Sequence, residues 1–209
     1  MSRPGPASNP EPPIDPALPA YLPRQDNSTL QSDVTRVLHD WAAPDHAQSS
    51  LREAYLGFLA ARADATWRSC EPGHITASAV VLSADRRQVL LTLHPRVGRW
   101  VQLGGHCEPG DPTIAAAALR EATEESGIAG LVIDPEPVHL EVHPITCSLG
   151  VATRHFDIRF RVLAPPGAVP AISAESVDLR FFPVNGLPGG DVGADNGVIT
   201  AIEGAVGRT

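Results

Sequence analysis

Cysteine and long apolar runs are scarce in this sequence, and each scarcity excludes a class of protein. Three cysteines occur among 209 residues, Cys70, Cys107 and Cys147, an odd count without CxxC spacing. We therefore predict neither a disulfide framework nor a cysteine-based zinc site. No run approaches the ~20 apolar residues of a membrane span, and the N-terminal residues form no apolar signal segment. These features are typical of a cytoplasmic protein with no membrane partner.

Positive charge is also in short supply. The chain has 16 Lys and Arg against 24 Asp and Glu, which gives a net charge of -8. This balance disfavours nucleic acid or an anionic membrane as the main partner. A phosphorylated small molecule stays open, because a bound metal ion inverts the local charge. The length predicts one main domain plus an extension. A homodimer stays open, because the sequence does not determine the oligomeric state.

The most informative stretch is residues 104–128, GGHCEPGDPTIAAAALREATEESGI. On a helix, Glu121, Glu124 and Glu125 fall within one stripe of ~100°. They lie in the last turns, where the helix dipole disfavours negative charge. The stretch contains no lysine, and Arg120 offsets only part of the charge. A hard cation, which prefers oxygen ligands, is the natural source of the remaining positive charge.

The alternative is that these glutamates form an ordinary solvated helix face. Two neighbouring features favour a site. An apolar stripe runs beside the acidic one and consists of Ala115, Ala118, Leu119 and Ala122. In addition, Gly104 and Gly105 follow a strand-like segment, 100–103, and allow the backbone to approach closely. A backbone carbonyl there would add one more oxygen ligand.

The same residues resemble the Nudix box of the Nudix hydrolase family. Gly105 is followed by five residues and Asp111, and residues 120–128 fill the second half of the pattern without a gap. The first acid is Asp instead of Glu, and eight residues instead of seven separate it from Arg120, a one-residue insertion. The resemblance covers residues 104–128 directly and, more loosely, residues 73–187.

The resemblance implies an α/β fold, a Nudix-like α/β/α sandwich with a mixed sheet, to which we add an N-terminal helical extension. It also implies a pyrophosphohydrolase that cleaves the diphosphate linkage of a nucleoside diphosphate derivative. The implied reaction is attack of water at phosphorus, with Mg2+ or Mn2+ as the metal. The alternative is a nucleotide-binding sensor that does not hydrolyse its ligand. Nucleoside triphosphates, nucleotide sugars, dinucleoside polyphosphates and ADP-ribose-type substrates all remain candidates.

The family pattern also assigns roles to residues. The expected metal ligands are the Gly104 carbonyl and the carboxylates of Glu121, Glu124 and Glu125. Arg120 is expected to orient this acidic cluster, and with Glu124 it belongs to the catalytic candidates. The insertion makes Asp111 and Glu108 second-rank candidates.

The third catalytic candidate, Glu175, lies outside the box. Several Nudix hydrolases carry a catalytic or metal-binding glutamate in a loop of this kind, so Glu175 is the expected general base and Asp178 the second choice. An exposed loop acid is the alternative. His155 and Asp157 share one face of a predicted strand, which points either into the site or to solvent, and we favour solvent. Adjacent His106 and Cys107 are not expected to converge on one ion.

We divide the chain into residues 1–27, a disordered Pro-rich tail, residues 28–70, a helical extension, and residues 71–209, the Nudix hydrolase domain. In the extension, the second helix is predicted to start at the capping box of Ser50 and to reach Ala63. The extension is expected to pack on the core, with partner binding or substrate capping as alternatives. Predicted strands cover 75–83, 88–94, 100–103, 131–133, 138–142, 151–163 and 177–182, and a last helix covers 196–206.

Overall fold

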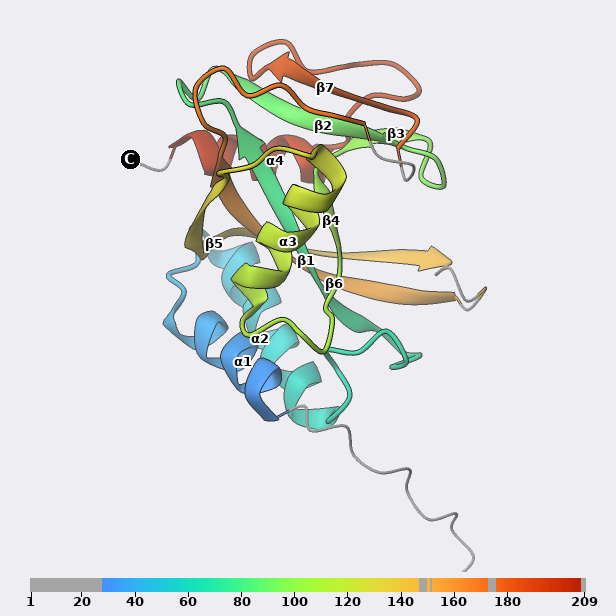
Figure 1. Cartoon of the computed structure of the whole chain (residues 1–209). Helices are drawn as coiled ribbons and strands as arrows, with labels where there is room; N and C mark the ends of the chain where they lie inside the picture. Colours follow the sequence, from blue (N-terminus) through green and yellow to red (C-terminus); the bar gives the residue numbers. More distant parts are fainter. Residues whose placement is uncertain (1–27, 147–149, 151, 173–175, 208–209) are drawn as a thin grey trace, which may run out of the picture.

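The computed structural model of the chain describes residues 28–146, 150, 152–172 and 176–207 (Figure 1). The predicted tail, Cys147 and Glu175 lie outside the described residues. The elements are, in chain order, α1 (Ser28–Asp40), α2 (His46–Ala61), β1 (His74–Leu82), β2 (Gln88–His94), β3 (Arg99–Val101), β4 (Leu103–His106), α3 (Ile114–Ser126), β5 (Val132–Thr146), β6 (Ala152–Leu163), β7 (Asp178–Pro183) and α4 (Asn196–Gly207).

Strand β1 lies at the centre of a mixed sheet, and all nine of its residues are buried. It pairs in parallel with β6 over its whole length, from His74 opposite His155 to Leu82 opposite Leu163. Its other edge pairs antiparallel with β4 in the first half and with β2 at the far end. The path through the sheet is β3-β2-β1-β6-β5, and β7 adds to β2. Parallel pairing of β1 with β6 requires the long crossover that carries α3.

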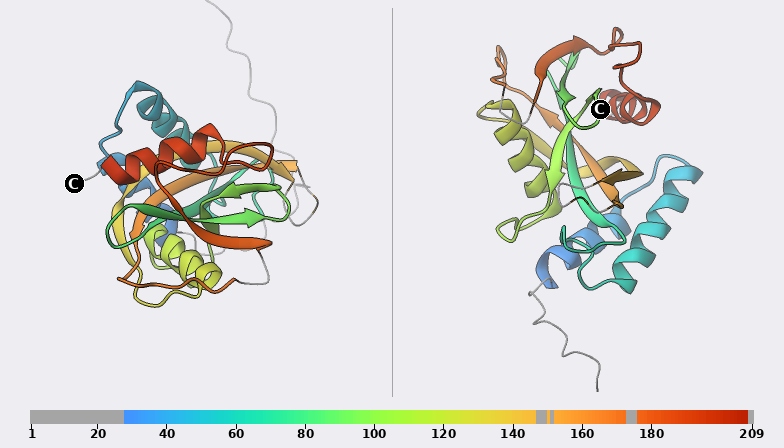
Figure 2. Two further views of the ribbon diagram at one scale, coloured as in Figure 1. Left: turned by 90° about the horizontal axis from the view of Figure 1, so that it is seen from above. Right: turned by 90° about the vertical axis from the view of Figure 1, so that its right-hand side faces the viewer.

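The sheet lies between α3 on one face and α4 on the other (Figure 2). Alternation along β1 explains the two layers, because successive side chains point to opposite faces. Ala77 packs in the same cluster as the α3 alanines, whereas Val80 and Leu82 pack against Val198 and Ile202 of α4. The predicted α/β/α sandwich with a mixed sheet is therefore confirmed.

The N-terminal helices share a core with the sheet, as predicted. Trp41, which directly follows α1, and Tyr55 of α2 are fully buried in the cluster that contains the α3 alanines. Gln48 of α2 pairs with the backbone of Leu140 in both directions, at 3.0 and 2.7 Å. The Tyr55 hydroxyl donates to the backbone oxygens of β5 and β6. The boundary between extension and domain near residue 70 stays a prediction.

The predicted start of the second helix was wrong. The helix begins at His46, because the Asp45 side chain accepts a hydrogen bond from the Gln48 N–H at 2.8 Å and so caps the first turn. Ser50 is an interior residue of α2 and not its cap. The helix ends at Ala61, earlier than the predicted Ala63.

The segments predicted at 131–133 and 138–142 form a single long strand, β5. Its pairing with β6 shifts register on both sides of Pro137. Proline cannot donate to a strand ladder, and it is tolerated at bulges and on edge strands. Strand β5 is at the end of the sheet path, so the bulge absorbs the proline and the strand continues.

Candidate active site

Helix α3 carries the acidic stripe, and its two ends are fixed by local chemistry. The Thr113 hydroxyl accepts a hydrogen bond from the Ala116 N–H at 3.1 Å, which caps the N-terminus. Gly127 ends the helix in the left-handed conformation with a φ of 65°, where glycine carries no steric cost. The helix buries Ala117, Ala118 and Ala122 against the sheet, and the acidic side chains lie at the margin of this apolar face.

The two glycines of β4 bring the backbone directly against the helix carboxylates. The Gly104 N–H donates to Glu125 Oε2 at 3.0 Å. Gly104 has a φ of +153°, and a Cβ there would lie 2.6 Å from Ser78 Cα. A Cβ on Gly105 would come within 2.6 Å of Glu121 Oε1. Both positions therefore require glycine for the approach that the sequence predicted.

Arg120 is the electrostatic partner of the acidic cluster. Its Nε and Nη2 donate to the two carboxylate oxygens of Asp111, each at 3.0 Å. Its Nη1 donates to Glu121 Oε1 and Glu124 Oε2, both at 3.1 Å, and its Nη2 also reaches the His106 carbonyl at 2.9 Å. The Asp111 hydrogen bonds, followed by the Glu121 charge, raise the pKa of Arg120 further above its ordinary value.

The structure therefore brings together Gly104, Arg120 and the three predicted helix carboxylates. Their exposures differ: the Glu121 side chain is 14% exposed and Glu124 is 60% exposed, while Glu125 is buried. A partly buried set of carboxylate oxygens beside a strand backbone is the donor chemistry that Mg2+ and Mn2+ prefer. The residues fit a hard cation with part of its shell open to solvent.

Asp111 has a role that the sequence did not reveal. It is buried, and it accepts both Arg120 hydrogen bonds and one from the Glu108 N–H at 2.7 Å. Asp111 thus positions Arg120. Glu108 is 64% exposed and lies 4.0 Å from the Arg120 guanidinium. The Nudix pattern marks an acid here, but the insertion obscured which groups it would meet.

The predicted general base cannot be placed, because Glu175 lies outside the described residues. The second choice, Asp178, lies at the start of β7, a strand that pairs with β2. Its carboxylate forms an ion pair with Arg180 and accepts the Leu179 N–H. It is thus already engaged with its own strand.

The assignment of Asp157 to solvent was wrong. Asp157 is 1% exposed and accepts hydrogen bonds from Thr76 and Ser78 at 2.9 and 2.8 Å. Arg159 donates to its other oxygen at 2.8 Å and to the Gly197 carbonyl of α4. Burial is the largest single effect and would raise the pKa of Asp157, but the charges of Arg159 and His143 and the hydrogen bonds from Arg159 and Ser78 together hold the pKa below its usual value. Strand alternation correctly predicted that His155 and Asp157 share one face of β6. It could not predict that α4 covers this face, because that contact is between segments distant in sequence.

Histidines continue this polar face toward the start of β1. His74 is buried, and burial lowers its pKa. Burial, followed by the neighbouring His106, lowers the pKa of His155 to about 3. Cys107 follows His106 in sequence but points away from the histidines, because its sulfur contacts the Ile75 carbonyl. Burial raises the pKa of the Cys107 thiol to about 12. The three rings are close together in space, which strand alternation along one segment does not reveal.

Comparison with known proteins identifies the family. A sequence model described as the NUDIX domain matches residues 72–201, more than half of the chain. The chain belongs to the NUDIX domain family, as the resemblance implied. Among the described residues, no helix is both long and apolar enough to cross a membrane.

Solved structures of the same family resemble the chain. A NUDIX family hydrolase from Clostridium perfringens is 22% identical, with a TM-score of 0.47, and covers 63% of this chain and 95% of its own. The E. coli dihydroneopterin triphosphate pyrophosphohydrolase is 20% identical, with a TM-score of 0.49, and the match covers 63% of this chain and 94% of that protein. The NUDIX domain of Shewanella oneidensis NrtR, complexed with ADP ribose, is 19% identical, with a TM-score of 0.39, and the match covers 53% of this chain and 73% of that one.

Proposed function

We propose that the protein is a Mg2+-dependent pyrophosphohydrolase that cleaves the diphosphate linkage of a nucleoside diphosphate derivative. The observation that carries this proposal is the convergence of three α3 carboxylates, Arg120 and the Gly104–Gly105 backbone at one edge of the sheet. Family membership supports it. The proposal implies a cytoplasmic setting, where nucleotides and Mg2+ are both available.

In this proposal the carboxylates of Glu121, Glu124 and Glu125 and the Gly104 carbonyl hold the cation. Mg2+, or Mn2+ in its place, supplies positive charge that neutralises the diphosphate as its bridging bond breaks. Glu121 and Glu125 are held on the sheet side, and Glu124 faces solvent, where a substrate arrives. Arg120 donates hydrogen bonds to Glu121 and Glu124, and the Gly104 N–H donates one to Glu125. These bonds hold the carboxylate oxygens in place before any ligand binds.

Arg120 acts as a positioning residue. Its five-donor guanidinium is divided between Asp111, two helix glutamates and the His106 carbonyl. These bonds use all five N–H groups, so the function of Arg120 is to fix the carboxylates and not to bind a substrate phosphate. We assign Glu175 to accept the proton of the attacking water, while a new P–O bond forms and the bridging P–O bond breaks.

The test is turnover of a panel of nucleoside diphosphate derivatives in Mg2+ by the wild type and by Glu124→Gln and Glu125→Gln. Loss of even an outer partner of a metal site costs 10- to 100-fold, so we expect kcat to fall by roughly 100-fold or more in both variants. Glu203→Gln changes an exposed glutamate of α4 and serves as the matched control. Its turnover should equal that of the wild type.

Two outcomes would overturn the proposal. Turnover that survives in both glutamine variants would show that the acidic stripe is not the catalytic centre. Metal-dependent binding of one nucleotide without turnover of any would instead assign the protein to the sensors of this family, in which the glutamates hold a ligand.

A further inference from the structure

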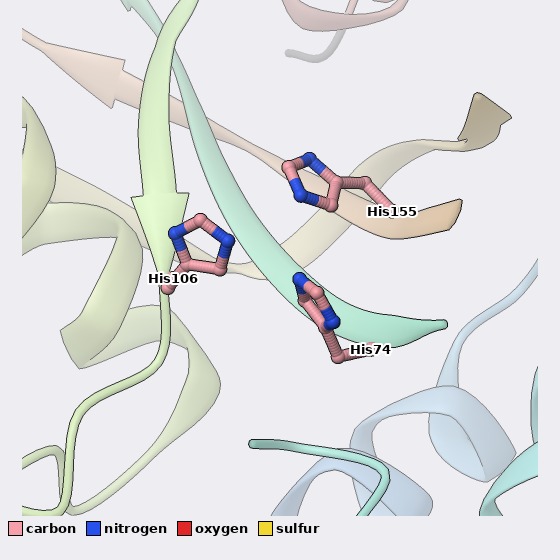
Figure 3. Close-up of side chains that lie close together, drawn as sticks. All are labelled: His74, His106 and His155. Atoms are coloured by element: carbon pink, nitrogen blue, oxygen red, sulfur yellow. The ribbon is translucent and has the colours of Figure 1, made fainter. Parts of the chain in front are cut away.

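Three histidines from three strands point toward one another on the face of the sheet opposite α3 (Figure 3). They are His74 of β1, His106 of β4 and His155 of β6. Strand register explains the cluster: His74 lies opposite His155, and His106 lies opposite Thr76, two residues further along β1. Each pair of ring centroids is 5.0 Å apart. One nitrogen from each ring can be chosen so that all three lie within 4.8 Å of one another.

Two of the rings carry a polar atom that the described part of the chain leaves unsatisfied. The Nε2 atoms of His74 and His155 are buried and have no hydrogen-bond partner among the described residues. A buried polar atom without a partner costs about 1 to 3 kcal/mol, so a native protein normally provides one. His74 also has its Nδ1 at 3.2 Å from the Cys70 carbonyl. When Nδ1 donates this bond, Nε2 is left as the lone-pair nitrogen, the form in which imidazole binds a metal.

We propose that His74, His106 and His155 form a binding site for Zn2+, chemically distinct from the carboxylate site on α3. Imidazole nitrogen suits Zn2+, whereas Mg2+ prefers oxygen. Three protein ligands are also the usual number for a zinc site that leaves its fourth position open. The site requires neither Cys107 nor any acidic residue.

The geometry requires a small closure on binding. A Zn–N distance of about 2.1 Å with tetrahedral angles puts ligand nitrogens about 3.4 Å apart. The nitrogens of the cluster lie within 4.8 Å, so rotation of the rings on their fixed strands brings them into range. His106 and His155 are only half buried, which leaves them room to turn.

The ion would connect the carboxylate site to the central strands. Gly105 and His106 are neighbours on β4, where successive residues face opposite sides of the sheet. Gly105 contacts Glu121 on the α3 side, and His106 meets β1 and β6 on the other side. Zinc at this position would therefore fix β4, and with it the backbone that approaches the helix glutamates.

The experiment is a zinc titration of the metal-stripped full chain at neutral pH, against a chromophoric chelator and in millimolar Mg2+. We expect one Zn2+ per chain with submicromolar affinity that Mg2+ does not reduce. Co2+ should give the intense visible bands of a tetrahedral site. His106→Asn and His155→Gln should each weaken zinc binding about 100-fold, because each removes one of three ligands.

Two control variants separate this site from others. His139→Gln replaces a buried histidine of β5 outside the cluster and should bind zinc like the wild type. Glu124→Gln should also keep its zinc, so the result does not depend on the hydrolase proposal. Zinc binding that Mg2+ displaces, or that Glu124→Gln abolishes while the histidine variants retain it, would place the ion at the carboxylates and overturn the inference. Absence of zinc binding and of the Co2+ bands in the wild type would also overturn it, whatever the folding of the variants.

Discussion

Single atoms decide the geometry of the carboxylate site. The absent side chain of Gly105 is the clearest case, because Glu121 occupies the space that a Cβ would need. The carboxylate in turn accepts a hydrogen bond from Arg120 and cannot swing away without losing it. A close approach of backbone to carboxylate is thus built from one missing methyl group and one charged hydrogen bond.

Gly105→Ala should therefore damage the site more than the fold. The new methyl would displace the Glu121 carboxylate, and we expect a 10- to 100-fold loss of Mg2+-dependent turnover, as for other groups that orient metal ligands. Gly110→Ala is the matched control, since a Cβ there meets nothing within 4 Å. Steady-state kinetics over a range of Mg2+ concentrations measures both. Equal activity in the two variants would contradict the proposed importance of this contact.

At the scale of elements, the helical extension supports α3 by a direct contact. Asp33 of α1 accepts a hydrogen bond from the Ile114 N–H, the first residue of α3, at 2.9 Å. Its carboxylate also stands at the positive end of the α3 dipole. With Thr113 it satisfies two of the N–H groups that open the helix. The extension therefore contributes a cap to the helix that carries the acidic stripe.

Asp33→Ala should lower the free energy of unfolding by about 1 to 2 kcal/mol, the usual cost of losing a helix cap. Asp40→Ala is the control, because Asp40 also pairs with Arg36 but is 70% exposed and caps nothing on α3. Urea unfolding followed by circular dichroism measures both. A loss in Asp40→Ala as large as that in Asp33→Ala would mean that the ion pair with Arg36, and not the cap, is responsible.

Local signals predicted most of these elements, and non-local contacts account for what they missed. The ends of α3 follow from Thr113 and Gly127, which lie beside the helix in sequence. By contrast, the continuity of β5 through Pro137 depends on its pairing with β6.

The same division applies to the candidate sites. The helix carboxylates were predictable because all three belong to one helix. The histidine cluster was not, since it depends on the parallel register of β1 and β6, which no local pattern contains.

At the scale of the whole molecule, buried histidines make stability depend on pH. Burial, followed by the Arg159 charge, lowers the pKa of His139 from 6.5 to about 4. Because the folded pKa lies below the unfolded one, the unfolded chain takes up the proton first as the pH falls. Stability from this group is complete above about pH 6.5 and is lost progressively toward pH 4.

We therefore expect the wild type to lose stability between pH 7 and pH 5, with His139 contributing on the order of 1 kcal/mol after allowance for solvent screening. His139→Gln cannot take up this proton, so its loss over the same interval should be smaller by that amount. Denaturant unfolding at both pH values measures the difference. An identical loss in the variant would show that other groups carry the pH dependence.

The contacts of α2 also set the order in which the chain can be completed. The hydrogen bond of Gln48 needs the backbone of Leu140, which is 92 residues later in the chain. The bond of the Tyr55 hydroxyl needs the backbone of Asp157, which is 102 residues later. At a synthesis rate of about 5 to 20 residues per second, roughly 5 to 20 s separate the making of this helix from that of its partners. During that interval the apolar side of α2, which includes Leu59, has no sheet to cover it. Helix α2 is thus made well before the strands that cover it, and its apolar side is where a nascent chain needs shielding.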